Sequence, residues 1–324
     1  MTCYGFDGVN FDRLVYTAVE CDDDQEVQNI LKNQIGMAAG MIKILKYNRG
    51  ILLDGEVVWG TAKVKKGQTI TMLLNCQNDM PDIVPPAITP ENGRLDIIYE
   101  DDAFIVINKP ADMVIHPTCS HQSGTLLNFL MHHWQQKGIM TDAHLVGRLD
   151  KDTTGLVIIA RNGYVQEHLK LQSINKIMKK YYIAAVAPAP KVESGTINAP
   201  IMRDYDSIIK RKISPEGAEA ITHYNVLEVG RSSSVDSEKQ ADFAVAEFLI
   251  ETGRTHQIRL HSSYSGFPII GDTLYGSEEW QNRAPHQLLH AYKIEIIHPI
   301  TGENMTFKVM PPEEWGEFYP QNMK

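Results

Sequence analysis

The sequence lacks a long apolar segment. Its longest apolar stretches, such as residues 156–160, are far shorter than the roughly 20 residues that a helix needs to span a bilayer. No basic region followed by an apolar core stands at the start of the chain, so no signal peptide is indicated. We therefore expect a cytoplasmic protein with no membrane partner.

Cysteine pairs and cofactor motifs are also missing. The four cysteines form neither a CxxC pair nor a cluster with histidine: Cys3, Cys21, Cys76 and Cys119. Reduced thiols are the simplest reading of that pattern. There is no GxGxxG motif, no P-loop and no clustered set of metal ligands. We expect no cofactor and no metal.

The chain has no excess of positive charge. Its formal net charge of −9 over 324 residues argues against a protein that attracts nucleic acid by bulk charge. The basic groups are nevertheless concentrated: residues 25–67 carry seven Lys or Arg against three acids, and residues 169–182 carry four lysines and no acid. Because phosphate contacts depend on where basic groups sit, RNA binding stays compatible with this composition.

The N-terminal part divides into an acidic segment, residues 1–24, and a compact unit, residues 25–76. Apolar residues recur at near-helical spacing over residues 27–47, which predicts a helical stretch there. Residues 50–58 read as two short strands around an Asp54-Gly55 turn. A second turn at residues 65–68 then leads into a strand.

This order resembles the S4 RNA-binding module. The resemblance implies that Lys43, Lys46 and Arg49 contact RNA. The density of arginine usual in that module is missing, and a generic helical cap is the alternative reading.

Four prolines fall within residues 77–92, which therefore predict a linker. The remaining residues, 93–317, contain short β-type runs, few long helical patterns, and a polar loop at residues 230–241. The runs are residues 105–107, 156–159, 182–186, 243–250 and 294–297. This pattern predicts an α+β domain with a mixed, largely antiparallel sheet.

The segment GRLDKDTTGL, residues 147–156, is the sharpest candidate for a site. In an extended chain Arg148 and Asp150 project from one face, while Leu149 turns inward. On spacing alone, a surface Arg–Asp pair at a turn would be the simpler interpretation.

Other segments in the same order weaken that simpler interpretation. They are residues 98–117 (containing NKP and VIHP), 180–186 (KYYIAAV), 253–276 (containing GRTHQIRLH and GFPIIGD), 289–291 and 298–303. Together with GRLDKDTTGL they resemble the RluA-type pseudouridine synthases, whose signature reads H-R-L-D-x-x-T-S/T-G. The resemblance covers residues 93–312 and implies a pseudouridine synthase fold with a central catalytic groove.

The chain departs from the family pattern at two positions. Gly147 stands where the family usually has His, so the geometry of the catalytic turn is in doubt. Ala218 stands where a lysine is common, which removes one basic group.

The resemblance also assigns roles to individual residues. Asp150 would be the catalytic carboxylate, Arg259 the cation that holds it ionised, and Tyr182 the ring that lies along the target uracil. Arg148 would enter the space left by the flipped base or contact phosphate. The other basic residues expected to contact RNA near the site are Lys179, Lys180 and Arg254.

We therefore expect a monomeric isomerase that converts uridine to pseudouridine in structured RNA. Ribosomal RNA is the favoured substrate because its loops expose bases for flipping, and transfer RNA is the alternative. A catalytically idle RNA chaperone or ribosome-assembly factor would keep the fold, but the intact Arg148-Leu149-Asp150 argues against it. A glycosidase acting on free nucleosides usually needs two carboxylates, and only Asp152 lies near.

Overall fold

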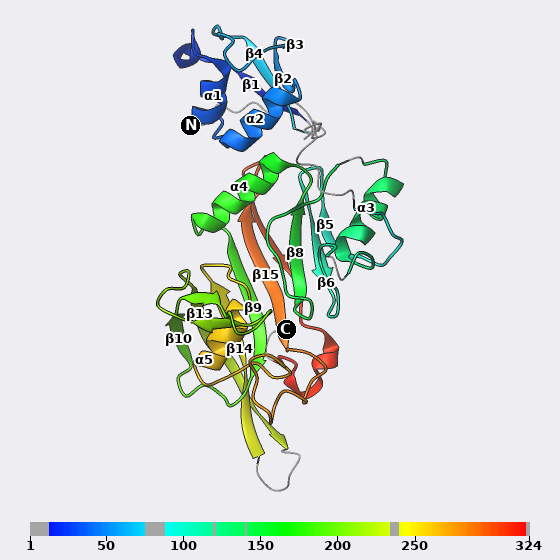
Figure 1. Ribbon diagram of the computed structural model, residues 1–324, viewed down its shortest axis with the longest axis vertical. Coiled ribbons are helices and arrows are strands. Elements are labelled where there is room, and N and C mark those ends of the chain that lie inside the picture. The colour runs from blue at the N-terminus through cyan, green and yellow to red at the C-terminus, as the bar shows by residue number, and fades with distance from the viewer. Residues whose placement is uncertain (1–12, 75–87, 119–120, 140, 234–239, 322–324) are drawn as a thin grey trace.

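The computed structural model describes residues 13–74, 88–118, 121–139, 141–233 and 240–321. A small N-terminal unit lies at one end of a larger unit that is built on a long sheet (Figure 1). The proline-rich segment expected to link the two units falls largely outside the described residues. None of the helices in the described ranges is long and apolar enough to cross a membrane.

The N-terminal unit is a four-stranded antiparallel sheet with two helices. The strand order is β1-β4-β2-β3. Its elements are β1 (Arg13–Thr17), the 3-10 turn η1 (Glu20–Asp22), α1 (Val27–Asn33), α2 (Ala39–Tyr47), β2 (Ile51–Leu53), β3 (Glu56–Val57) and β4 (Thr69–Leu73). Asp54 and Gly55 both have positive φ, as a two-residue hairpin turn requires, so the predicted turn is present.

Two features of this unit differ from the sequence-based expectation. The helical stretch over residues 27–47 is broken into α1 and α2, and Gly36 in the break has a φ of +70°. The apolar spacing hid the break because Ile35 and Met37 are buried although they lie outside both helices. Residues 13–17 pair with β4, so the unit includes part of the segment that was expected to precede it.

The larger unit is built on a ten-stranded mixed sheet. Its main path runs β10-β13-β14-β9-β15-β8-β6-β5, with β16 beside β15 and β7 beside β8. Only the β15–β8 pair is parallel among the described strands, so the predicted largely antiparallel α+β fold is confirmed. The strands are β5 (Asp96–Glu100), β6 (Phe104–Lys109), β7 (His144–Leu145), β8 (Thr154–Ala160), β9 (Lys179–Val186), β10 (Ser194–Asn198), β13 (Ile221–Ser233), β14 (Gln240–Ile250), β15 (Leu289–Ile297) and β16 (Asn304–Lys308).

The remaining elements flank this sheet. They are α3 (Leu126–Gln136), α4 (Gly163–Ile174), α5 (Gln257–Tyr264), the 3-10 helix η2 (Glu313–Phe318) and the hairpin β11 (Ile201–Arg203) with β12 (Arg211–Ile213). Strand β13 runs to Ser233 and β14 begins at Gln240, so both strands extend into the expected loop at residues 230–241.

Alternation along the central strands decides what packs on each face. In β8, Leu156 and Ile158 face one apolar cluster together with α4, while Val157 and Ile159 face another together with α3. In β9, Tyr182 shares its face with Ile258 of α5. A strand buried on both faces in this way reads as a continuous apolar run, which is why β8 could be predicted locally.

Gly155 explains how β8 packs beside β15 at its first residues. It has a φ of +106°, and a Cβ there would lie 2.3 Å from the backbone oxygen of Ala291 in β15. Only glycine allows β8 and β15 to approach this closely at the point where the chain leaves the 146–153 segment.

Candidate active site

The segment before β8 carries Asp150 to the middle of the sheet. Leu149 packs inward against two apolar clusters, which directs its neighbours Arg148 and Asp150 to the other side. The Thr153 N–H donates to the Asp150 backbone oxygen at 3.2 Å and closes the turn. Buried Lys109 anchors the same turn, since its Nζ donates to the backbone oxygen of Lys151 at 2.6 Å.

Asp150 pairs with Arg259 of α5, 109 positions later in the chain. Arg259 Nη1 lies 3.1 Å from Asp150 Oδ2. The Arg259 side chain is 5% exposed and that of Asp150 is 25% exposed, so the carboxylate is the open end of the pair. The structure therefore brings together the two residues that the family resemblance placed in one site.

Asp272 binds Arg259 through the two guanidinium nitrogens that do not contact Asp150. Arg259 Nε donates to Asp272 Oδ2 and Nη2 donates to Oδ1, both at 2.7 Å. This two-bond pairing fixes the plane of the guanidinium and leaves Nη1 for Asp150. The two carboxylates together raise the pKa of Arg259 although burial opposes them.

The loop at Gly271 holds Asp272 in place. Gly271 has a φ of +77°, and a Cβ there would lie 2.1 Å from the backbone oxygen of His286. Asp272 Oδ1 also accepts from the backbone N–H groups of Leu274 and Tyr275. Burial would raise the pKa of Asp272, but Arg259 and these N–H groups outweigh it and hold the pKa below its usual range.

His256 and Gln257 form the turn into α5. His256, in the left-handed conformation, is the N-cap, and Arg259 lies in the first turn of the helix. Gln257 holds the turn, because its Oε1 accepts from Thr252 Oγ1 and from the Arg254 N–H. His256 Nε2 lies 3.9 Å from Asp150 Oδ2, and burial lowers the His256 pKa more than Asp150 raises it.

Tyr182 forms a wall of the same groove. It lines a pocket of about 60 Å³ together with Asp150 and Arg259. The side chain is nearly covered, and burial and then the charge of Asp150 raise the pKa of its hydroxyl. Its ring therefore offers a flat, neutral surface beside the carboxylate.

Comparison with known proteins identifies the family. The model of the RNA pseudouridylate synthase family matches residues 103–264. The chain is 34% identical over 285 residues to the uncharacterized RNA pseudouridine synthase YhcT of Bacillus subtilis, covering 88% of this chain and 89% of that protein. This chain belongs to the RluA-type RNA pseudouridine synthases.

The synthase has further relatives of the same kind. It is 35% identical to the ribosomal large subunit pseudouridine synthase D of Pasteurella multocida, covering 82% of this chain and 81% of that protein. Its fold matches human RNA pseudouridylate synthase domain containing 1 with a TM-score of 0.55 at 23% identity, covering 71% of this chain and 87% of that one. The synthase is thus an isomerase acting on RNA.

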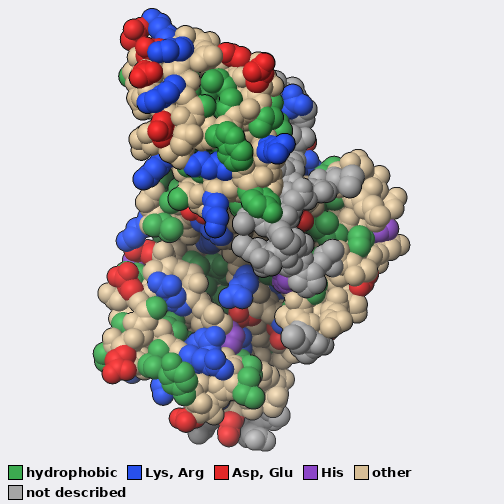
Figure 2. Space-filling view, turned by 45° about the horizontal axis from the view of Figure 1, so that its top comes forward, with side chains coloured by type: hydrophobic (Ala, Val, Ile, Leu, Met, Phe, Trp, Pro, Cys, Tyr) green, Lys and Arg blue, Asp and Glu red, His purple; other side chains and the backbone are tan. Residues whose placement is uncertain are grey.

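The other predicted RNA contacts of the synthase divide into two groups. Arg148 and Arg254 line a larger pocket of about 630 Å³ that also contains Asp150, and Figure 2 shows Lys and Arg side chains around a hollow in this part of the molecule. Lys180 lies in a neighbouring pocket, whereas Lys179 is exposed on the opposite face of β9 and lines none of these pockets. The N-terminal basic residues are not among the lining residues either: Lys43, Lys46 and Arg49.

Sequence reasoning missed the part that Asp272 plays in the site of this synthase. The residue was visible within the GFPIIGD segment but carried no assigned role. A glycine directly before an acid in an otherwise apolar segment was the available signal, since a buried carboxylate needs a partner. Among the described residues, no group of three or more His, Cys, Asp or Glu side chains could hold a metal ion.

Proposed function

We propose that the synthase isomerises uridine in ribosomal RNA with Asp150 as its catalytic carboxylate. The observation that carries this proposal is the 3.1 Å contact between Asp150 and Arg259, made at an open groove by an arginine that is itself fixed by Asp272. The guanidinium compensates the carboxylate charge when RNA covers the groove and excludes water.

The reaction breaks the N1–C1′ bond and forms a C5–C1′ bond. The uracil gains a proton at N1 and loses the proton at C5, so no oxidant or energy donor is needed. Asp150 can act by attack on C1′ or by removal of the C2′ proton, and both routes require an ionised carboxylate. Tyr182 holds the uracil by stacking on its face while the base turns between the two bonds.

Ribosomal RNA is proposed as the substrate because of the relatives. Ribosomal large subunit pseudouridine synthases D from several bacteria are 33–36% identical to this chain. A uracil flipped from a loop would enter the pocket that Tyr182 and Asp150 line, and Arg148, which lines the same pocket, would fill the space that the base leaves in the RNA.

The N-terminal unit supports binding in this proposal. Lys43, Lys46 and Arg49 lie on or directly after α2 and give that unit cations that can contact RNA outside the catalytic groove. The unit would thus add affinity without taking part in the chemistry.

The test is Asp150→Asn, compared with Asp152→Asn as a matched control two positions away. The amide can neither attack nor take a proton, so tritium release from RNA containing [5-³H]uridine should fall below detection. Asp152→Asn should retain turnover, because Asp152 does not line the pocket of Tyr182 and Arg259. Turnover of Asp150→Asn within tenfold of wild type would refute the assignment. Pseudouridine maps of total RNA with and without the gene then test the substrate, and a lost site in transfer RNA would overturn the ribosomal assignment.

A further inference from the structure

A second, strongly basic pocket lies beside the catalytic groove. It has a volume of about 330 Å³ and shares Tyr182, Arg148 and Arg254 with the pockets around Asp150. Every charged side chain that lines it is positive, and none of its lining residues is an acid. These four cations are Arg148, Lys170, Lys180 and Arg254. In a protein with a net charge of −9, such a concentration is local and calls for an anionic ligand.

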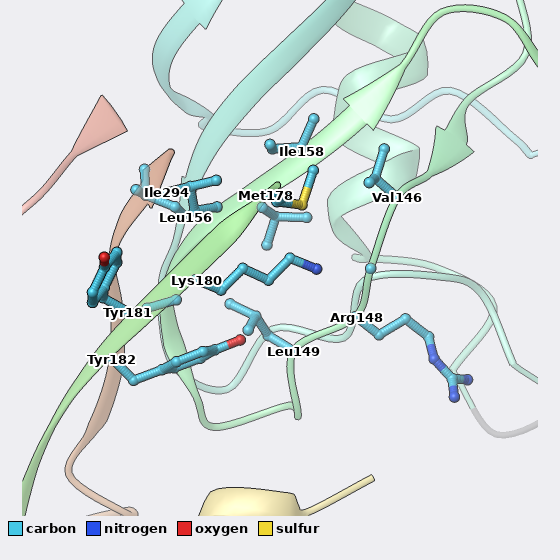
Figure 3. A pocket seen from close by; sticks show the side chains of 13 residues that line it. Val146, Arg148, Leu149, Leu156, Ile158, Met178, Lys180, Tyr181, Tyr182 and Ile294 are labelled. Atoms are coloured by element: carbon cyan, nitrogen blue, oxygen red, sulfur yellow. The ribbon is translucent and has the colours of Figure 1, made fainter. Parts of the chain in front are cut away.

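Lys180 is the innermost of these cations. It lies two positions before Tyr182 on β9, so both side chains project from the same face of the strand. Figure 3 shows the Lys180 ammonium pointing across Leu149 toward the segment that carries Arg148. Burial lowers its pKa, and no carboxylate contributes to that pKa. The side-chain ammonium groups of Lys180 and Lys170 form no hydrogen bond or ion pair with any residue that the structure describes.

Gly147 leaves room for this ammonium. A Cβ at position 147 would lie 3.2 Å from Lys180 Nζ, which is tighter than an ordinary contact. The backbone of Gly147 needs no positive φ, so its absent side chain is a matter of space and not of strain. Gly147, which replaces the family's usual His, therefore lies next to Lys180, the most enclosed lysine of the pocket.

A phosphate fits these observations better than a base or a carboxylate from the protein. An ammonium that is partly removed from water and has no counter-ion is costly, and a ligand with several anionic oxygens can satisfy two lysines and an arginine at once. Because Tyr182 lines both this pocket and the catalytic one, a phosphate bound here would lie close to the nucleotide on Tyr182.

We propose that Lys180, Lys170 and Arg148 form a binding site for an RNA backbone phosphate next to the flipped uridine, in space that Gly147 leaves open. This inference rests on the proposed function, which places the uridine against Tyr182. It adds a site that fixes the register of the strand, so that the correct nucleotide reaches Asp150.

The test measures binding of a fluorescein-labelled ten-nucleotide oligouridylate to the full chain over a series of NaCl concentrations. Lys180→Gln and Lys170→Gln should each weaken binding about three- to tenfold at low salt and flatten the slope of log K against log salt by about 0.7, the value for one phosphate contact on a single strand. Lys179→Gln is the matched control. The sequence suggested an RNA contact for Lys179 as well, but its side chain lies on the opposite face of β9 and lines none of these pockets, so this variant removes the same charge one position away from Lys180. It should leave the slope unchanged.

Two further measurements use an RNA strand without backbone charge and a variant with a smaller expected effect. Lys180→Gln should not weaken binding of a methylphosphonate oligouridylate, which has no backbone charge. Gly147→Ala should weaken binding of the charged strand less than Lys180→Gln does, because the flexible ammonium can move by a few tenths of an ångström. Lys170 lies on the surface of α4, so its variant decides the question even if Lys180→Gln fails to fold.

Two results would overturn the phosphate site. One is a salt slope for both pocket variants that equals the wild-type slope. The other is equal flattening by Lys179→Gln, which would indicate diffuse attraction by surface charge. Turnover is not measured, so the outcome is independent of Asp150: an active Asp150→Asn variant would refute the catalytic assignment and leave the binding result standing.

Discussion

Asp272→Asn offers the most specific test of how this synthase holds its catalytic pair. The substitution keeps the shape of the side chain but replaces one carboxylate oxygen by an NH₂ group. One arginine N–H that now donates to Asp272 would then face another donor. The remaining oxygen can still accept from the backbone N–H groups of Leu274 and Tyr275.

The structure sets the expected size of the effect. Asp272 is fully buried and makes two 2.7 Å bonds to Arg259, and breaking a buried ion pair commonly costs about 3–5 kcal/mol. Arg259 keeps Asp150 as a counter-ion, so we expect a loss of about 2–4 kcal/mol in the free energy of unfolding. The guanidinium also loses its fixed plane, and misplacement of a catalytic group by about 1 Å can lower the rate about 100-fold.

The assay combines urea unfolding with tritium release from RNA. We expect kcat to fall about 10- to 100-fold with little change in KM, because Asp272 does not line the RNA pockets. Asp242→Asn is the control: its pair with Arg231 is exposed and should contribute no more than about 1 kcal/mol. A folded Asp272→Asn variant with kcat within threefold of wild type would show that Arg259 does not need this support.

Three other outcomes are expected. Tyr182→Leu should weaken RNA binding by about 1–3 kcal/mol while Tyr182→Phe binds almost normally, since stacking needs the ring and not the hydroxyl; equal losses would remove the stacking role. Replacing Lys43, Lys46 and Arg49 together by Gln should flatten the slope of log K against log salt by up to about 2 if each of them contacts one phosphate. An unchanged slope would contradict RNA binding by the N-terminal unit. Burial would raise the pKa of Glu100, but hydrogen bonds from Lys137 and His133 lower it from 4.5 to about 2, so Glu100 contributes stability that is complete above about pH 4.5 and disappears as pH falls toward 2. Glu100→Gln should therefore flatten the dependence of unfolding free energy on pH in that window, and an unchanged curve would show that Glu100 is not the responsible group.

Much of the site could be predicted from the sequence because its signals are local. Strand β8 is buried at every position and apolar from Leu156 to Ala160. The alternation in β9 places Tyr182 and Ile183 on opposite faces of that strand, whatever surrounds it. The GRLD segment and the segment around Arg259 marked both partners of the ion pair, although 109 positions separate them. The family pattern supplied the link that spacing alone could not.

The tertiary structure decided what depends on distant neighbours. Strand β1 is a short, ordinary segment that becomes part of a sheet only because β4, more than fifty positions later, offers it an edge. The break between α1 and α2 was hidden because Ile35 and Met37 stay buried in the shared core, so the apolar pattern continues where the helix does not. Burial by tertiary packing and helical spacing leave the same trace in a sequence.

The contacts that hold the site residues in place were also decided by the tertiary structure. That Asp272 fixes Arg259, and that Lys180 reaches the space beside Gly147, follow from the way α5 and the 146–153 segment pack on β9. A side chain's partners on other elements are set by the fold and leave no periodic signal in the chain. The sequence by itself therefore determined the chemistry available to this synthase, and only the packing of its elements determined how that chemistry is held in place.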